Sequence, residues 1–344
     1  MTTTQQILRS EVILEKYGKK LAGKTILITG VSDESLAGEL ALQVSTANPK
    51  LLILSARAES KVAGIRARIH ALTPEVQVRF LKMDLSDFAD VRKAAGDLAD
   101  VSHIDHLVCV AGVMMPPYSK TKDGIESQLA VNYLANFLLV KLLLPQVRAA
   151  GPESSVIIVA SGAVRVGKMN FEDYNFRNGE SYNPMVAYGQ SNAARVMFVK
   201  RLGEKLKSEK IRVFSLDPGA MQTGLLRHIS SEFLEQFMEL SKTGQLMKDL
   251  DGNDFSYPPV TGTSEGAATI ITGMLDPTIA EYNGSYLYQN AVADQDLHTH
   301  VNDQDNWTRL WDAEGSTNAA SGLHVHELHG SSMAVVIGLV AGIM

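Results

Sequence analysis

The amino-acid sequence predicts an α/β fold with a doubly wound parallel sheet, in a single domain with a long insert after the sixth strand. Short runs rich in β-branched residues alternate with longer segments of helical periodicity, and the alternation repeats about six times. The apolar runs are continuous, which is typical of strands buried on both faces. Such strand–helix–strand units form a parallel sheet through right-handed crossovers, with helices on both faces.

The predicted elements follow one another regularly. Residues 1–21 are expected to form a helical extension that lies on the domain, because their apolar residues fall near helical spacing. The strands are expected at Lys24–Thr29, Leu51–Ser55, Val76–Met83, Ile104–Val110, Ser155–Ala160 and Ile211–Leu216. Helical patterns between them include Glu34–Val44, Lys61–Ala71 and Ile125–Arg148. The nucleotide-binding domain is placed at residues 22–315.

Two segments depart from this alternation. Residues 222–260 follow the sixth strand and leave the sheet at its carboxyl edge, where open α/β sheets bind ligands. We therefore interpret them as a substrate lid, with a helical surface insertion as the alternative. Residues 316–344 are expected to be a flexible tail with a short apolar end, too short to span a membrane. The three tail histidines, His324, His326 and His329, fit a solvated linker better than a metal site.

Composition excludes some functions. The net charge of -6 and the interspersed signs argue against a nucleic-acid partner, which usually requires a basic face. Cys109 is the one cysteine, so a reducing compartment is expected, and residues 1–20 lack the apolar core of a secretory signal. We expect a cytoplasmic protein. Membrane association and a metal cofactor are not expected.

Three strand ends suggest a dinucleotide site. After the first strand, Gly30 permits a tight turn toward a pyrophosphate, although Ser35 and Ala37 stand where further glycines are usual. A turn that only starts a helix is the alternative. After the second strand, Arg57 replaces the acid that binds an NAD ribose, and its guanidinium suits the 2′-phosphate of NADP. After the third, Asp84 could accept from an adenine amino group, or cap the next helix together with Ser86.

With these positions, the chain resembles the short-chain dehydrogenase/reductase superfamily, and within it the retinol-dehydrogenase-like reductases common in fungi. The resemblance covers residues from about 22 to about 312. It rests on TG at 29–30, Arg57, DL at 84–85, AG at 111–112, VNYLANF around Asn132, VASGAV around Ser161, YGQS at 188–191 and DPGAMQT at 217–223.

The resemblance implies a role for each matching residue. Tyr188 would donate and accept the proton, Ser161 would hold the substrate oxygen, and Asn132 would kink its helix and tie a water into the proton relay. Asn192 completes the predicted catalytic set by its position. The cofactor-binding residues are predicted to be Gly30, Ser32, Ser35, Leu36, Arg57, Asp84, Leu85, Ala111, Gly112, Tyr188, Asn192, Pro218, Gly219 and Thr223, the last three at the nicotinamide end.

One departure bears on activity. Four residues beyond Tyr188, where the family has a lysine that holds the nicotinamide ribose, stands Asn192. A unit charge ~5 Å from a phenol is worth about 3 kcal/mol at an effective dielectric of ~20, or about 2 units in its pKa. Arg195 could supply a charge, but it lies about two helical turns beyond Tyr188, so the sequence favours a site without a local cation. Cys109 and Val110 likewise replace the usual pair of asparagines.

The predicted function is NADP(H)-dependent reduction of a carbonyl on a small hydrophobic substrate, or oxidation of the alcohol. Loss of the lysine should impair oxidation more than reduction, because oxidation requires the tyrosinate. Two alternatives remain: an isomerase or dehydratase that reuses the pocket, and an NADP-binding pseudoenzyme with an interaction role. A homodimer through the helices of Asn132 and Tyr188 is a further expectation from the resemblance.

Overall fold

The protein was analysed as a computed structural model, which describes residues 7–312. Its main sheet has the strand order β10-β9-β6-β5-β4-β1-β2-β3. All pairs are parallel except the β9–β10 pair at the edge. The strands are β1 (Thr25–Thr29), β2 (Leu51–Ala56), β3 (Gln77–Lys82), β4 (His106–Cys109), β5 (Ser155–Val159), β6 (Arg212–Asp217), β9 (Tyr286–Tyr288) and β10 (Ala291–Val292). The strand order reverses between β1 and β4, and ligands bind at such a switch point.

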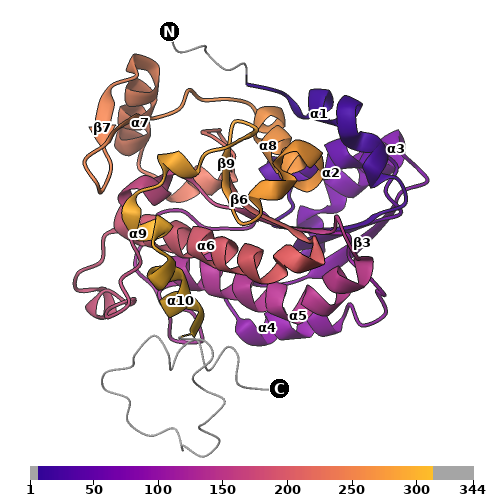
Figure 1. The fold of residues 1–344 in the computed structure, drawn as a ribbon, viewed down its shortest axis with the longest axis horizontal. Coiled ribbons are helices and arrows are strands. Elements are labelled where there is room, and N and C mark those ends of the chain that lie inside the picture. Colours follow the sequence, from indigo (N-terminus) through magenta and orange to yellow (C-terminus); the bar gives the residue numbers. More distant parts are fainter. Residues whose placement is uncertain (1–6, 313–344) are drawn as a thin grey trace, which may run out of the picture.

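Helices cover both faces of the sheet (Figure 1). One face carries α2 (Leu36–Ser45), α3 (Ala63–Leu72) and α8 (Thr263–Leu275), with α1 (Ser10–Tyr17) packed on α8. The other carries α4 (Phe88–Gly96), α5 (Ala135–Ala150) and α6 (Pro184–Leu206). Side chains of one strand alternate between the two layers: Leu27 joins the α5 side, whereas Ile26 and Ile28 join the α2 side.

The remaining helices are short. A π-helical segment, η3 (Leu129–Leu134), leads directly into α5. The 3-10 helices are η1 (Gly18–Leu21), η2 (Glu59–Lys61), η4 (Gly162–Val166), η5 (Arg177–Gly179), η6 (Lys207–Glu209), η7 (Gly224–His228), η8 (Pro277–Tyr282) and η9 (Asp294–Asp296). At the C-terminal end of the described chain, α9 (Thr299–Asn302) and α10 (Gln304–Asp312) pack on α6.

The predicted fold class is confirmed, and each predicted strand coincides with an observed one to within two residues at either end. The sequence analysis missed β9 and β10, which extend the sheet beyond β6. The predicted N-terminal helix is α1, where the Ser10 and Ser264 hydroxyls lie 2.8 Å apart. The interpretations of residues 316–344 and of their histidines lie outside the described residues.

The insert after β6 contains η7, α7 (Ser231–Thr243) and an antiparallel pair, β7 (Leu246–Lys248) and β8 (Asp254–Ser256). It stands apart from the sheet at one side of the molecule (Figure 1). By length and hydropathy alone, the segment Leu129–Ala150 could cross a membrane, but 72% of its most apolar stretch is buried in the fold. We therefore describe it as a core helix of the domain.

Candidate active site

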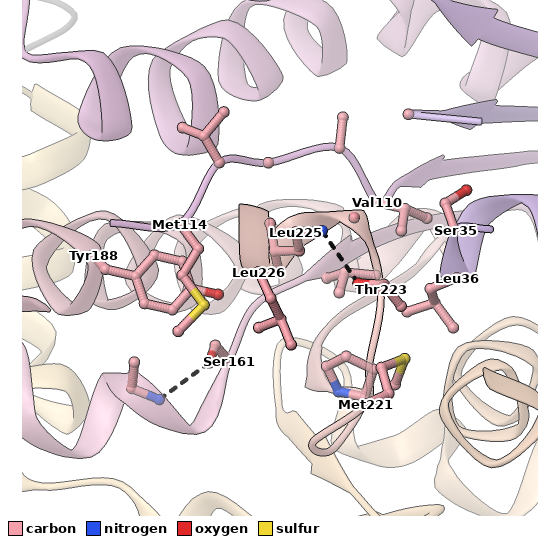
Figure 2. Close-up of a pocket in the computed structure, with 18 of the residues that line it drawn as sticks. Ser35, Leu36, Val110, Met114, Ser161, Tyr188, Met221, Thr223, Leu225 and Leu226 are labelled. Atoms are coloured by element: carbon pink, nitrogen blue, oxygen red, sulfur yellow. Dashed lines mark hydrogen bonds between the residues drawn. The ribbon is translucent and has the colours of Figure 1, made fainter. Parts of the chain in front are cut away.

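A cavity of about 1140 Å³ lies at the carboxyl edge of the sheet, over the switch point. It extends from Ser35 and Leu36 at one end to Ser161 and Tyr188 at the other (Figure 2). Of the predicted site residues, the structure brings these to its wall: Gly30, Ser32, Ser35, Leu36, Arg57, Asp84, Leu85, Ala111, Gly112, Ser161, Tyr188, Pro218, Gly219 and Thr223. Asn132 and Asn192 are fully buried behind the wall.

The turn after β1 depends on two glycines. Gly30 has a φ of +79°, and a Cβ there would lie 2.8 Å from the Cα of Ala111. A Cβ on Gly38 would lie 2.2 Å from the carbonyl oxygen of Ser32. The Ser35 hydroxyl caps α2 by accepting from the Gly38 N–H at 3.0 Å. The chain therefore turns closely around an open space at a helix N-terminus, which suits an anion.

The residues that follow β2 and β3 also line the cavity. Arg57 is exposed at the rim, and Lys61 in η2 joins it there as a second cation that the sequence analysis missed. In the sequence, the only indication of a role for Lys61 is its position four residues after Arg57. The Asp84 carboxylate accepts from the N–H and hydroxyl of Ser86 at 2.9 and 2.7 Å. The alternative that Asp84 and Ser86 cap α4 is wrong, because Asp87 is the capping residue.

Tyr188 lies in the first turns of α6, which begins at Pro184 behind the capping side chain of Asn183. Its side chain is buried, and burial raises the pKa of the phenol, while hydrogen bonding to Ser161 and the charge of Arg195 lower it. The Ser161 hydroxyl accepts from the Ala163 N–H at 3.2 Å and lies beside Tyr188 (Figure 2). The pair can thus present a protonated phenol and a hydroxyl to one ligand oxygen.

Asn132 lies in the π-helical segment η3, consistent with the predicted kink. Its side chain joins three elements, since it donates to the Val113 carbonyl and the Ser191 hydroxyl, both at 2.9 Å, and accepts from the Val113 N–H at 2.8 Å. Its backbone carbonyl accepts from the side chains of Asn136 and Arg195. Asn132 therefore acts on the site by positioning its neighbours.

Asn192, predicted to complete the catalytic set and to contact the cofactor, is buried behind the cavity wall in contact with Tyr188. Its amide donates to the backbone carbonyl of Tyr188 at 2.9 Å, one turn earlier in α6, and the residue has no exposed surface. Hydrogen bonding to the Asn192 side chain also lowers the pKa of the Tyr188 phenol. Asn192 is thus a neighbour of Tyr188 and is not one of the residues that line the cavity.

Arg195 lines the cavity instead, which the sequence analysis did not favour. Helical spacing places the backbone of Arg195 about two turns from that of Tyr188. This estimate does not include the length of the arginine side chain. The guanidinium extends back along α6 and donates to the carbonyls of Asn132 and Ala111, the latter at 2.7 Å. Its burial lowers the pKa of Arg195 to about 10, so it remains charged at neutral pH.

Asp217 is a second missed residue, at the end of β6 beside Ser161. Burial raises the pKa of its carboxyl to about 6, although the N–H of Gly219 donates to it at 2.9 Å. A Cβ on Gly162 would lie 2.8 Å from this carboxyl, so the loop after β5 packs directly against it. A negative charge on Asp217 raises the pKa of Tyr188 and opposes the effect of Arg195.

The wall opposite the strand ends is apolar and comes largely from the insert. Side chains of α7, β8 and the following loop reach the cavity: Phe233, Leu234, Phe237, Met238, Phe255, Tyr257, Pro258 and Val260. Met114, Leu225 and Leu226 continue this surface toward Tyr188 (Figure 2). The insert thus forms a wall of the cavity, as the lid interpretation requires. Among residues 7–312, no three His, Cys, Asp or Glu side chains are placed to hold a metal ion.

Comparison with known proteins points to one family. Residues 24–175 match the family model of the short chain dehydrogenases. Human retinol dehydrogenase 11 is 35% identical over 212 residues, which cover 61% of this chain and 65% of that protein. The alignment therefore spans just under two thirds of that relative. Mouse retinol dehydrogenase 14 is 29% identical over 300 residues, covering 84% of each chain.

Solved structures show the same architecture. An uncharacterised protein from Mycobacterium paratuberculosis superposes with a TM-score of 0.61 at 25% identity, over 85% of this chain and 92% of that one. The Pseudomonas aeruginosa protein RhlG, solved with NADP, gives a TM-score of 0.57 at 23% identity, over 78% of this chain and 94% of that one. The parallel sheet with helices on both faces agrees with these matches. Residues 24–175 and the relatives above thus make this chain similar to the short-chain dehydrogenase/reductase family, whose members use nicotinamide cofactors.

Proposed function

We propose that this protein is an NADP(H)-dependent oxidoreductase that reduces the carbonyl group of an apolar substrate, or oxidises the corresponding alcohol. The observation that carries the proposal is the Tyr188–Ser161 pair, buried at the end of a cavity whose other end is a glycine turn at a helix N-terminus. The similarity to this family and the retinol dehydrogenases among the relatives support the reaction class.

The residues present fit a dinucleotide phosphate. The turn around Gly30 and Gly38 leaves no room for side chains, as a closely approaching pyrophosphate requires. Arg57 and Lys61 place two cations at the rim, where an NAD-binding site commonly has a carboxylate. An arginine fork binds a phosphate in a bidentate manner. These features favour NADP over NAD.

The chain's own residues account for the acid–base chemistry. A bound nicotinamide supplies or accepts the hydride. Tyr188 can donate its phenolic proton to the oxygen of a carbonyl that is being reduced, and burial raises the pKa of this phenol. The Ser161 hydroxyl donates a second hydrogen bond to that oxygen and holds the carbonyl against the phenol. In the oxidative direction the tyrosinate removes the alcohol proton.

The apolar wall suits a hydrophobic substrate. Phe237, Phe255 and Tyr257 form a cluster in the insert, with ring centroids 4.8 Å apart for Phe237–Tyr257 and 6.1 Å apart for Phe255–Tyr257. Apolar surface of this kind favours a substrate by about 25 cal/mol for each Å² that it covers. We propose that the insert selects apolar carbonyl compounds, including aldehydes, and excludes water when they bind.

The decisive experiment measures NADPH consumption with a panel of apolar aldehydes and ketones, using the full chain, Tyr188→Phe and Ser161→Ala. We expect NADPH-dependent reduction by the full chain and a loss of roughly 10²–10⁴-fold in Tyr188→Phe. Phenylalanine keeps the ring but removes the proton, so cofactor affinity should change little. NADPH binding without turnover of any substrate, or equal rates in Tyr188→Phe, would contradict the proposal.

We also propose that the protein works in a reducing compartment such as the cytoplasm. Cys109 is buried in β4, and burial raises the pKa of its thiol to about 12, so it is poorly suited to redox chemistry. Imaging a fluorescent fusion with the full chain would test the compartment. Enrichment in a membrane or secretory compartment would contradict this part of the proposal.

A further inference from the structure

The side chain of Arg195 brings a positive charge into the wall of the cavity, and no acid within residues 7–312 forms an ion pair with it. The residue is 4% exposed, and among residues 7–312 its hydrogen bonds go to neutral oxygens of Asn132, Ala111 and Asn192. Burying an uncompensated cation is costly, and arginines in protein interiors are usually paired with an acid. The cost here indicates that the charge serves a ligand or a neighbouring group.

The surroundings of Arg195 are built around the guanidinium. A Cβ on Gly112 would lie 3.2 Å from one of its terminal nitrogens and 3.0 Å from the side-chain oxygen of Asn132. Asn132 lies in the π-helical segment η3, and its backbone carbonyl accepts a hydrogen bond from the guanidinium. The hydrogen bonds above use three of the five N–H donors of an arginine, which leaves two for a ligand in the cavity.

The guanidinium acts electrostatically on Tyr188. Arg195 favours the ionised phenol, and the phenolate in turn favours the charged guanidinium. Two other titratable groups face this pair. Asp217 on β6 opposes ionisation of Tyr188, and Cys109 on β4 interacts electrostatically with Arg195. Asn192 sits between the two side chains on α6 and accepts from the guanidinium at 3.5 Å.

We propose that Arg195 is the residue that supplies positive charge to this site: its guanidinium stabilises the ionised form of Tyr188 and fixes the Asn132 and Ala111 carbonyls at the cavity wall. The role of this charge in catalysis rests on the proposed function. When Tyr188 gives its proton to a substrate oxygen, the phenol becomes a phenolate beside the guanidinium. The same charge lets Tyr188 remove a proton from an alcohol. Asn192 is then the neutral neighbour that leaves room for Arg195.

The first test measures the ionisation of Tyr188 without using turnover. Fluorotyrosine is incorporated at position 188 in the full chain, and its ¹⁹F resonance is followed against pH; fluorine lowers the pKa of the phenol into a range that the fold tolerates. We expect Arg195→Gln to raise the titration midpoint by about one to two pH units. Arg195→Lys, which keeps the charge, should change it much less.

The matched control is Lys200→Gln, which removes a cation from the same helix where it pairs with Asp294 at 2.8 Å. This variant should leave the Tyr188 midpoint unchanged. An equal midpoint in Arg195→Gln and the unsubstituted chain, with the fold intact by circular dichroism, would overturn the proposal. If Arg195→Gln does not fold, Arg195→Met serves as a second neutral variant, and the comparison of its titration midpoint with that of Arg195→Lys decides.

The second test moves the charge. Asn192→Lys/Arg195→Gln places a cation one helical turn closer to Tyr188 and removes the guanidinium. We expect alcohol oxidation to fall roughly 10- to 100-fold in Arg195→Gln, with the pH–rate profile displaced to higher pH, and to recover in the double variant. A displaced ¹⁹F midpoint without turnover in any variant would overturn the proposed function and keep the inference. Turnover with an unchanged ¹⁹F midpoint in Arg195→Gln would overturn the inference and support the proposed function.

Discussion

Asp217, Ser161, Tyr188 and Arg195 form a polar group inside an otherwise apolar domain. Each of these side chains is buried or half-buried. The result is a site in which two charges of opposite sign act on one phenol, because Arg195 lowers the pKa of Tyr188 while Asp217 raises it. Substitutions that change either charge should therefore change the pH at which Tyr188 works.

Replacing Asp217 by Asn should change how stability depends on pH. The carboxyl has a pKa of about 6 in the folded chain, against an ordinary value of 3.8. Between these values the folded state keeps a proton that the unfolded chain has lost, so the stability of the native protein falls as pH rises from about 4 to about 6. Asp217→Asn removes this dependence, which amounts to at most about 3 kcal/mol.

Urea unfolding of both proteins at pH 4, 5, 6 and 8 would measure this difference. The free energy of unfolding of Asp217→Asn should rise relative to the native chain up to about pH 6 and stay level above it. The lost acceptor for Gly162 adds a constant offset that does not vary with pH. A difference that is flat from pH 4 to pH 8 would show that Asp217 titrates normally.

Replacing Arg57 by Ala should weaken NADPH binding more than NADH binding. One charge-assisted contact of about 1.5–3 kcal/mol corresponds to a loss of roughly 10- to 150-fold in affinity for NADPH. Lys61→Ala, at the same rim, is the matched comparison and should show a smaller effect in the same direction. Fluorescence titration with both cofactors measures it. Equal affinity of the native chain for NADPH and NADH would argue against this site for the 2′-phosphate.

The sequence predicted Tyr188, Ser161 and the strand-end residues, which the structure places at the cavity wall, because their types and order are specific. It did not identify Arg195 or Asp217 as site residues. An arginine side chain can extend back along its helix by more than one turn, and neither its rotamer nor the π-helical segment opposite can be read from spacing. Asp217 depends on burial by η4, which only the fold provides.

At the scale of elements, η4 and α6 meet backbone to backbone. A Cβ on Gly167 would lie 2.0 Å from the carbonyl carbon of Gly189, the residue after Tyr188. This contact sets the separation between the segment that carries Ser161 and the helix that carries Tyr188. The strands were predictable because continuous apolar runs are long enough to recognise. The three-residue β9 and the β7–β8 pair were not, since they are too short to show a period.

Gly167→Ala should therefore harm activity more than a surface substitution of the same size. The added methyl group must displace η4 from α6, which separates Ser161 from Tyr188 and destabilises the fold by about 1–3 kcal/mol. Gly124→Ala is unsuitable as a control because its φ is +78°, whereas Gly96 has open space around its Cβ position. Thermal melts and turnover of Gly167→Ala and Gly96→Ala would compare the two. Equal loss in both would contradict a specific role for the contact.

Aromatic side chains of the insert should affect substrate binding. Phe237 and Phe255 face the cavity from α7 and β8, and neither is part of the sheet core. Phe237→Ser should raise KM for large apolar substrates roughly tenfold by removing apolar contact area, while NADPH affinity and the KM for a small aldehyde change little. Steady-state kinetics with two substrates of different size would separate these effects. Uniform changes for both substrates would favour the alternative of a surface insertion.

At the scale of the whole molecule, α10 covers the outer face of α6. Trp311 stacks on Phe198 with ring centroids 6.1 Å apart and meets Phe137 of α5 edge-on at 6.3 Å. The sequence analysis expected a homodimer through the helices of Asn132 and Tyr188, which are η3–α5 and α6. Part of that surface is occupied by the chain's own α10. The expectation of a dimer remains a prediction, restricted to what α10 leaves exposed.

Trp311→Ala should uncover Phe137 and Phe198. We expect the melting temperature to fall by roughly 3–8 °C, and the exposed aromatic patch to promote self-association. Differential scanning fluorimetry and analytical ultracentrifugation would measure both changes. Removal of residues 320–344 is the comparison, and it should leave folding and cofactor affinity unchanged because the sequence predicts a flexible tail there. A Trp311→Ala chain with an unchanged melting temperature would show that α10 contributes little to the fold.

Positions 192 and 195 face the same buried volume from successive turns of α6, and this has a consequence for how the chain can evolve. A lysine at 192 beside Arg195 would bring two cations together in a site with a single phenol, whereas two neutral side chains would leave none. Moving the positive charge from position 195 to position 192 requires two substitutions. Whichever substitution comes first, the intermediate has either two cations or none and should be less active than both end points. The two positions are expected to show sign epistasis, and a change at one should be inherited together with a change at the other.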